Sequence, residues 1–221
     1  EKILSMGARE NNLLYNPYGV DIKAFQPDPE VQKEYDLLFV GRFVEKKSPI
    51  LTVLMIKDLV DEYPELRVAM AGDGPLLGTA RKVATVLGIN KNIIFFGKQS
   101  HKDVATLMLK SKIYIQHSVV ATNGDREGSP VSILEALASG LPVVSTLHAG
   151  IPEAVTHEEN GYLVQELDLK SMKKYILELI DNKQKRVLMG KNARKKIESD
   201  YSMDKRIGIL RNEMEKLVSS T

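Results

Sequence analysis

The sequence contains no cysteine, no Asp-x-Asp pair and no long apolar run. Without cysteine the chain has no disulfide, no thiolate metal ligand and no cysteine nucleophile, which fits a reducing compartment such as the cytoplasm. No apolar run approaches the ~20 residues that a membrane-spanning helix needs, and no signal peptide is visible. The net charge of +2 over 221 residues is too small to argue for nucleic acid as a partner. Because the chain starts at Glu1 rather than Met, we expect it to be a fragment of a longer protein.

Several catalytic classes also lack their characteristic residues. Without Asp-x-Asp there is no evident carboxylate pair to hold Mg²⁺ or Mn²⁺ against a diphosphate, and the histidines have no metal-ligand spacing. The sequence has no P-loop, no Gly-x-Gly-x-x-Gly and no Gly-x-Ser-x-Gly. His117 and His148 follow predicted strands, and we interpret both as hydrogen-bonding residues rather than catalytic bases. We therefore expect a site without metal or cofactor.

Short apolar runs alternate with amphipathic stretches along most of the chain. The runs are apolar nearly throughout, which is typical of parallel strands buried on both faces. The alternation predicts right-handed βαβ units and an α/β, doubly wound, Rossmann-like sheet. The predicted strands span residues 37–40, 67–71, 93–96, 113–116, 142–145 and 161–164. The predicted helices span residues 50–62, 76–87, 101–110, 131–139 and 169–181.

The two ends of the chain differ from this alternating region. Residues 1–21 begin with a short helical fragment and continue as a turn-rich linker, residues 22–200 form one domain, and residues 201–221 form an amphipathic helix. Residues 170–196 hold ten Lys or Arg and two acidic residues. They predict two helices with solvated basic faces, or a weak attraction to an anionic membrane surface.

Loops that contain glycine follow the first three predicted strands, as Gly41-Arg42, Gly72-Asp73-Gly74-Pro75 and Gly97-Lys98. Turn chemistry alone explains each of them, but the carboxyl ends of parallel strands share one edge, so together they predict a cleft. Gly41 permits close backbone approach, and Arg42 offers a planar donor fork for phosphate oxygens. Lys47 can bring a second positive charge that stabilises a departing diphosphate. The alternative is that both cations are solvated loop residues.

Residues 127–135, Glu-Gly-Ser-Pro-Val-Ser-Ile-Leu-Glu, carry the most informative pattern. We expect Ser129 to cap a helix whose first residue is Pro130. The free amides at such a helix start suit phosphate or sugar oxygens. Glu127 and Glu135 can accept hydrogen bonds from hydroxyl groups. Anion donors beside hydroxyl acceptors are what a nucleotide-sugar requires, although the two carboxylates could also simply lie near a favourable helix start.

These segments together resemble the C-terminal, donor-binding half of GT-B retaining glycosyltransferases of family 4, the glycosyl transferases group 1. The resemblance runs from about residue 15 to residue 180, and the Glu-x₇-Glu run is its most specific part. It is carried by Phe39-Val40-Gly41-Arg42 with Lys46-Lys47, Ala71-Gly72-Asp73-Gly74-Pro75, Phe95-Phe96-Gly97, the run from Glu127 to Glu153, and Asn160-Gly161-Tyr162-Leu163-Val164. One departure is Ser48, where the family commonly has glycine.

The resemblance implies a role for each matching residue. Arg42 and Lys47 would hold the donor diphosphate and neutralise it as it leaves, and Glu127 would bond the hydroxyls of the transferred sugar. Glu135 would hold the ribose, and Lys98 would frame the base. The amides of the loop and helix start would face sugar and phosphate, from the four residues Gly128, Ser129, Pro130 and Val131.

The resemblance also implies an activity for the parent enzyme. A hexose would pass from a UDP- or GDP-sugar to a glycan or lipid-linked acceptor, with retention by front-face attack and no obligatory metal. The polar loop before Glu127 resembles enzymes of bacterial surface polysaccharide assembly. The acceptor would bind an N-terminal domain for which the chain has no room, so we expect the isolated fragment to be inactive. We expect a cytoplasmic protein, with peripheral membrane association as an open question.

Two other functional classes remain open at this point. One is a non-catalytic nucleotide-binding module with a Rossmann-like fold. The other is a GT-B phosphorylase or epimerase; a phosphorylase that uses pyridoxal phosphate would need a Schiff-base lysine beside the cleft, for which Lys46, Lys47 and Lys98 qualify by position.

Overall fold

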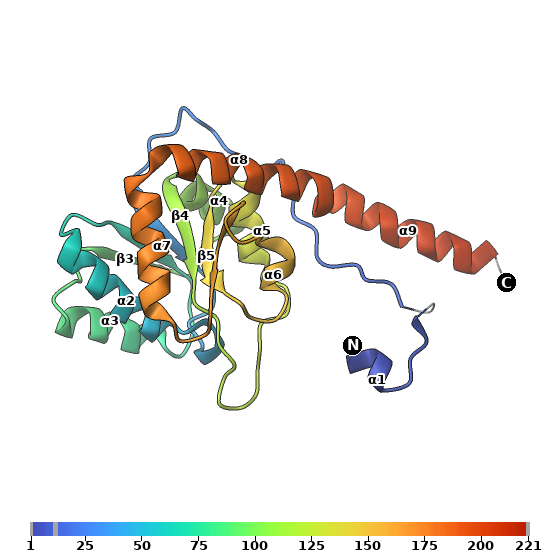
Figure 1. The fold of residues 1–221 in the computed structure, drawn as a ribbon, viewed down its shortest axis with the longest axis horizontal. Coiled ribbons are helices and arrows are strands. Elements are labelled where there is room, and N and C mark those ends of the chain that lie inside the picture. The colour runs from blue at the N-terminus through green and yellow to red at the C-terminus, as the bar shows by residue number, and fades with distance from the viewer. Residues whose placement is uncertain (1, 11–12, 220–221) are drawn as a thin grey trace.

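Six parallel strands form a single sheet in the computed structural model, which describes residues 2–10 and 13–219 (Figure 1). The strand order is β3-β2-β1-β4-β5-β6, the order of a doubly wound sheet. The strands are β1 (Tyr35–Val40), β2 (Val68–Ala71), β3 (Ile93–Gly97), β4 (Ser111–Gln116), β5 (Val143–Thr146) and β6 (Gly161–Val164). All six predicted strands are confirmed, with ends that differ by at most two residues.

Helices connect the strands, and the predicted helices are confirmed. They are α2 (Pro49–Glu62), α3 (Leu77–Val86), α4 (His101–Leu109), α5 (Val131–Ala138), α6 (Ile151–Ala154), α7 (Leu169–Asp181), α8 (Lys183–Asp200) and α9 (Met203–Ser219), with a short α1 (Lys2–Ser5) near the N-terminus. The sequence did not predict the four-residue α6 or the 3₁₀ turn η2 (Glu45–Lys47). Both are too short to show a periodic apolar pattern.

Each face of the sheet is covered by its own set of helices. The helices α2, α3 and α7 pack on one face, where Leu37 and Phe39 of β1 meet them. The other face carries α4, α5, α6 and part of α8, and there Leu38 and Val40 point into the core. Because successive strand residues face opposite sides, a strand buried on both faces must be apolar at every position.

The ligand-binding edge of such a sheet is fixed by its topology. The chain runs outward from β1 to β2 and β3, then crosses back to β4, so the connections diverge between β1 and β4. Ligands of doubly wound sheets bind outside the carboxyl ends of the strands at this divergence. The loops after Val40, Ala71, Gly97 and Gln116 all lie at this edge.

The N-terminal segment meets the start of α9 beside the domain. The Val20 amide donates to the Tyr201 carbonyl (2.8 Å), and the Met203 amide donates to the Val20 carbonyl (3.0 Å). From there α1 and α9 extend outward on the same side of the sheet domain (Figure 1). Along α9, Ile207, Leu210 and Met214 are exposed apolar residues. In the described part of the chain, no helix has the length and apolar character of a transmembrane span.

Candidate functional site

An open groove of about 380 Å³ lies at the carboxyl ends of β1, β2 and β3. Arg42 and Lys98 line it, and both are exposed, without a side-chain hydrogen bond or ion pair to any other described residue. The remaining lining residues are Val40, Gly41, Ala71, Gly72, Asp73, Gly74, Gln99 and Val104. We call this set the open groove. Its two free cations are suited to an anionic ligand.

Backbone packed on backbone forms the wall of the open groove. The Gly41 amide donates to the Ala71 carbonyl (3.0 Å), and the Gly72 amide donates to the Gly97 carbonyl (2.8 Å). Gly72 has a φ of +137°, and a Cβ atom there would lie 1.8 Å from the Gly41 carbonyl oxygen. Only glycine fits this position, so Gly72 is required by close contact between the loops as well as by its turn.

A buried corner adjoins the groove and consists of Lys47, Tyr114, Gln116, Glu127 and Ser132. The Lys47 ammonium lies 3.1 Å from Gln116 Oε1 and 3.3 Å from Glu127 Oε1. Gln116 Oε1 also accepts from the hydroxyls of Tyr114 (3.1 Å) and Ser132 (3.3 Å). Lys47 and Glu127 are 9% and 7% exposed. The corner is therefore a connected polar network inside the protein.

Glu127 keeps unused acceptor capacity in this network. Its Oε1 atom is buried and has no hydrogen bond of acceptable geometry, although the Lys47 ammonium is 3.3 Å away. The contact is therefore an ion pair without a directed hydrogen bond. Burial lowers the pKa of Lys47, and the nearby Glu127 carboxylate opposes that shift. A buried carboxylate oxygen without a well-directed hydrogen bond is costly in the free protein and can accept one from a ligand hydroxyl.

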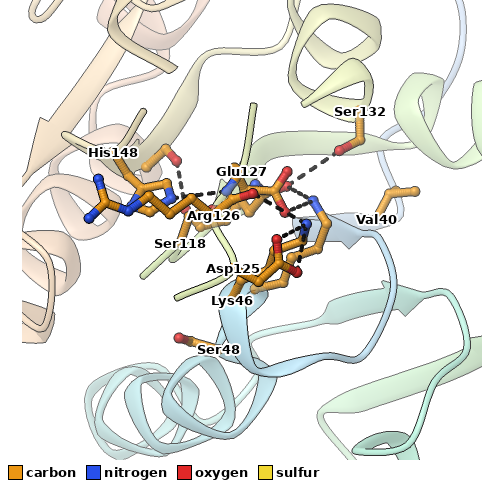
Figure 2. Close-up of polar contacts among 12 residues, drawn as sticks. Val40, Lys46, Ser48, Ser118, Asp125, Arg126, Glu127, Ser132 and His148 are labelled. Atoms are coloured by element: carbon orange, nitrogen blue, oxygen red, sulfur yellow. Dashed lines mark hydrogen bonds and ion pairs between the residues drawn. The ribbon is translucent and has the colours of Figure 1, made fainter. Parts of the chain in front are cut away.

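The loop of residues 119–128 is fixed against η2. The Glu45 carboxylate accepts from the Thr122 amide (2.8 Å) and hydroxyl (2.9 Å). The Lys46 ammonium pairs with Asp125 (3.1 Å), and Figure 2 shows this contact beside Glu127. Ser48, which ends η2, has a φ of +41°, a left-handed conformation that explains why a glycine would suit this position.

The start of α5 differs from the prediction by one residue. Pro130 is extended (φ −70°, ψ 109°) and is itself the N-cap, so the helix begins at Val131, and Ser129 makes no capping bond. Ser129 as cap and Pro130 as first helical residue were therefore wrong. The physical reason is that the ψ angle of Pro130 lies outside the helical range, so the first helical residue is Val131. No side chain caps α5, so the backbone amides of its first turn make no bond to a capping side chain and can donate to a ligand.

Glu135 lies one turn into α5 and is 7% exposed. Its Oε1 atom lies 3.2 Å from His101 Nε2 at the start of α4. Burial raises the pKa of Glu135, and the contact with His101 opposes this shift. The ring of His101 packs edge-on against Phe25 at 4.7 Å between centroids. His101 was not among the predicted site residues, because nothing in its sequence spacing links it to Glu135.

The predicted site residues thus fall into two connected groups. Arg42, Lys98 and Gly41 line the open groove, whereas Lys47 and Glu127 belong to the buried corner. Gly41 joins the groups, because a Cβ atom there would lie 2.7 Å from Lys47 Cδ. Gly128 and Val131 are exposed at the helix start, and Ser129 is half-buried. The alternative that both cations are solvated loop residues is wrong for Lys47, which is buried and paired, whereas Arg42 is exposed.

The polar residues that hold the buried corner together were not predicted from the sequence. Tyr114 and Gln116 alternate along β4 and therefore point to the same face, and Ser132 meets them from α5. A polar glutamine at the end of an apolar strand was the available signal. Among the described residues, no three His, Asp or Glu side chains gather into a metal-binding group.

The model of the family "Glycosyl transferases group 1" matches residues 21–196 of this sequence. The chain belongs to this family. The matched residues cover all six strands and include the open groove and the buried corner. The resemblance inferred from the motifs is therefore confirmed.

The curated relatives are glycosyltransferases that are longer than this chain. It is 25% identical over 203 residues to the amylovoran biosynthesis glycosyltransferase AmsK of Erwinia amylovora, covering 91% of this chain and 50% of AmsK. It is 26% identical over 201 residues to a GDP-mannose-dependent monoacylated α-(1-6)-phosphatidylinositol monomannoside mannosyltransferase of Corynebacterium glutamicum, covering 85% of this chain and 52% of that protein. The chain spans about half the length of these relatives.

Solved structures share the fold. The C-terminal domain of the group 1 family protein LpcC from Francisella tularensis superposes with a TM-score of 0.73 at 22% identity, covering 84% of this chain and all of that domain. Anabaena HepE, solved with UDP, gives a TM-score of 0.80 at 19% identity, covering 99% of this chain and 60% of HepE. The sheet domain is thus a Rossmann-like half of the GT-B type, as predicted.

Proposed function

We propose that this chain is the donor-binding half of a retaining glycosyltransferase that transfers a hexose from a nucleoside diphosphate sugar to a glycan or lipid-linked acceptor. The observation that carries the proposal is the buried Oε1 atom of Glu127, which lies 3.3 Å from the Lys47 ammonium and has no hydrogen bond of good geometry. A sugar hydroxyl would supply a well-directed hydrogen bond.

The diphosphate would lie between the two groups of residues. Arg42 is exposed in the open groove, and Lys47 is buried behind Gly41. Charge that develops on the leaving diphosphate would be stabilised by Arg42, by Lys47 and by the uncapped amides at the start of α5. Glu135, near the same helix start, would bind the ribose hydroxyls. The base would lie in the open groove beside Lys98.

The reaction class is proposed from family membership and from this arrangement. The resemblance implies retention by front-face attack, with the leaving phosphate assisting deprotonation of the acceptor. The acceptor would bind a second domain, which the greater length of the relatives accommodates. AmsK is named for amylovoran biosynthesis, which supports a role in bacterial polysaccharide assembly. The proposed location is the cytoplasmic side of the membrane.

Calorimetric titration of the purified chain tests the proposal. UDP, GDP and ADP would be titrated first, followed by UDP-glucose, UDP-N-acetylglucosamine and GDP-mannose, each with and without EDTA. We expect one base to be preferred and its affinity to be unchanged in EDTA. Binding that EDTA abolishes would overturn metal independence, and no binding of any nucleotide or nucleotide-sugar would overturn the donor-site assignment.

A further inference from the structure

His148, two residues after the end of β5, is buried, and both of its ring nitrogens contact other residues. Its Nε2 atom lies 3.1 Å from the Glu127 backbone nitrogen, and its Nδ1 atom lies 2.6 Å from Glu166 Oε1. A backbone N–H can only donate, so Nε2 must be the acceptor. The hydrogen of the neutral ring is therefore on Nδ1 and is donated to Glu166. Figure 2 shows His148 beside Glu127, on the side away from Lys46.

Glu166, two residues beyond β6, fixes the orientation of the histidine ring. Its second oxygen, Oε2, accepts from the Val120 amide at 3.1 Å, so the carboxylate bridges His148 and the start of the 119–128 loop. Burial raises the pKa of Glu166, but the hydrogen bonds from His148 and Val120 outweigh it and leave the pKa below its usual value. The carboxylate is thus ionised and holds one tautomer of His148.

Gly128, the residue after Glu127, is also held by the segment that follows β5. The Gly128 carbonyl accepts from the Gly150 amide at 3.0 Å. A Cβ atom on Gly150 would lie 2.5 Å from that carbonyl oxygen, so glycine is needed for the close approach. The amide of Glu127 and the carbonyl of Gly128 are therefore both bound by the segment that follows β5. This leaves the backbone of Glu127 little freedom to turn.

We propose that Glu166 and His148 form a positioning relay that fixes the backbone of Glu127 and so directs its carboxylate toward the donor sugar. This inference rests on the proposed function, in which Glu127 bonds the sugar hydroxyls. Neither relay residue lines the open groove. The relay acts through Glu127, so it should affect recognition of the sugar and leave recognition of the nucleoside diphosphate largely intact.

Two substitutions of His148 separate its two contacts. His148→Gln can place an amide oxygen near the Nε2 position and keep an acceptor for the Glu127 amide. His148→Asn reaches only the Nδ1 position, so it can contact Glu166 but not Glu127. We expect His148→Asn to lower the affinity for the bound nucleotide-sugar at least 10-fold while changing the affinity for the matching UDP or GDP less than 3-fold. His148→Gln should recover most of the loss.

Glu166→Ala tests the relay at a second residue, whose side chain is 32% exposed and therefore carries less risk to folding. It should reproduce the effect of His148→Asn. His157→Gln is the matched control, because His157 also accepts a backbone amide, from Leu163 at 3.0 Å, but has no contact with the 119–128 loop. Both of its affinities should equal those of the wild type.

Titrations with UDP-glucose, UDP-N-acetylglucosamine and GDP-mannose, and with UDP and GDP, provide the measurement, and circular dichroism confirms folding of each variant. Equal losses for nucleotide-sugar and nucleotide would overturn the relay in favour of a purely structural role. Unchanged affinities in both His148→Asn and Glu166→Ala would also overturn it. If the wild type binds none of these probes, the proposed function fails and the inference fails with it.

Discussion

The buried corner and the open groove lie at the same edge of the sheet but are held in opposite ways. Lys47 and Glu127 are nearly inaccessible and belong to a network of side chains from η2, β4 and α5. Arg42 and Lys98 are exposed on glycine loops and are held by no other described residue. A buried network can fix the position of one acceptor, whereas exposed cations can adapt to a diphosphate and a base. The buried corner thus holds an acceptor in a fixed position, and the open groove supplies adaptable positive charge.

The largest expected effect is a difference in stability between variants of the buried corner and of the open groove. Lys47→Met leaves the Glu127 carboxylate buried without a counter-charge, and we expect the free energy of unfolding to fall by about 3–5 kcal/mol. Arg42→Met, at an exposed position, should change it by less than about 0.5 kcal/mol. Urea unfolding measures both. The double variant Lys47→Met/Glu127→Gln should lose less than Lys47→Met alone, and equal stability of Lys47→Met and wild type would contradict the buried pair.

A second prediction concerns the pH dependence of stability and a buried histidine near the site. His117 follows β4, is fully buried and accepts from the Leu167 amide at 3.0 Å. Burial lowers the pKa of His117 to about 4, while Glu166 and Asp168 oppose the shift. Between about pH 4 and 6.5 the unfolded chain then binds the extra proton, so the stability contribution is present at pH 7 and is lost as the pH falls through this window.

The size of this effect follows from the same shift. Protonation of the unfolded histidine should lower the free energy of unfolding by roughly 2–3 kcal/mol between pH 6.5 and pH 4. Urea unfolding of wild type and His117→Gln at several pH values gives the difference, in which the contributions of other groups cancel. Parallel pH curves for the two proteins would show that His117 does not titrate in this way.

A third prediction tests the groove by affinity rather than stability. Arg42→Ala removes a charged, planar donor, and we expect nucleotide affinity to fall by about 10- to 100-fold, the range of charge-assisted hydrogen bonds. The free energy of unfolding should be unchanged, because the side chain is exposed. Titration calorimetry with the preferred nucleoside diphosphate measures the loss. Arg211→Ala, an exposed arginine on α9, is the control, and equal affinities of the two variants would remove Arg42 from the site.

The same two regions show how far the sequence could predict the molecule. The open groove was predictable, because apolar runs locate strands buried on both faces, and parallel strands bring the loops after Val40, Ala71 and Gly97 to one edge. The position of each strand was confirmed within two residues. The positions of Glu127 and Glu135 near one helix start were also predictable, because they follow from local spacing along a single segment.

The buried corner was not predictable in the same way. Lys47 meets Gln116 across 69 positions of sequence, and the turn η2 that directs it inward has no periodic signal. Likewise, His148 reaches the Glu127 amide from a segment that follows another strand, and Glu166 contacts His148 from beyond a third strand. The start of α5 depended on the ψ angle of Pro130, which the motif does not determine. Contacts between distant loops, rather than local propensity, set these details.

The smallest expected effect is at Lys98, on the far wall of the open groove. Its ammonium is exposed, so its attraction to the anionic nucleotide would be worth about 0.5–1 kcal/mol, as for other exposed charge pairs. Lys98→Ala should therefore weaken nucleotide binding only a few-fold, and this difference should shrink when the salt concentration is raised from 50 to 500 mM, roughly a threefold shorter screening length. Calorimetry at the two salt concentrations measures it. A loss as large as that of Arg42→Ala, unaffected by salt, would mean that Lys98 is desolvated in the complex and that the groove closes around the nucleotide.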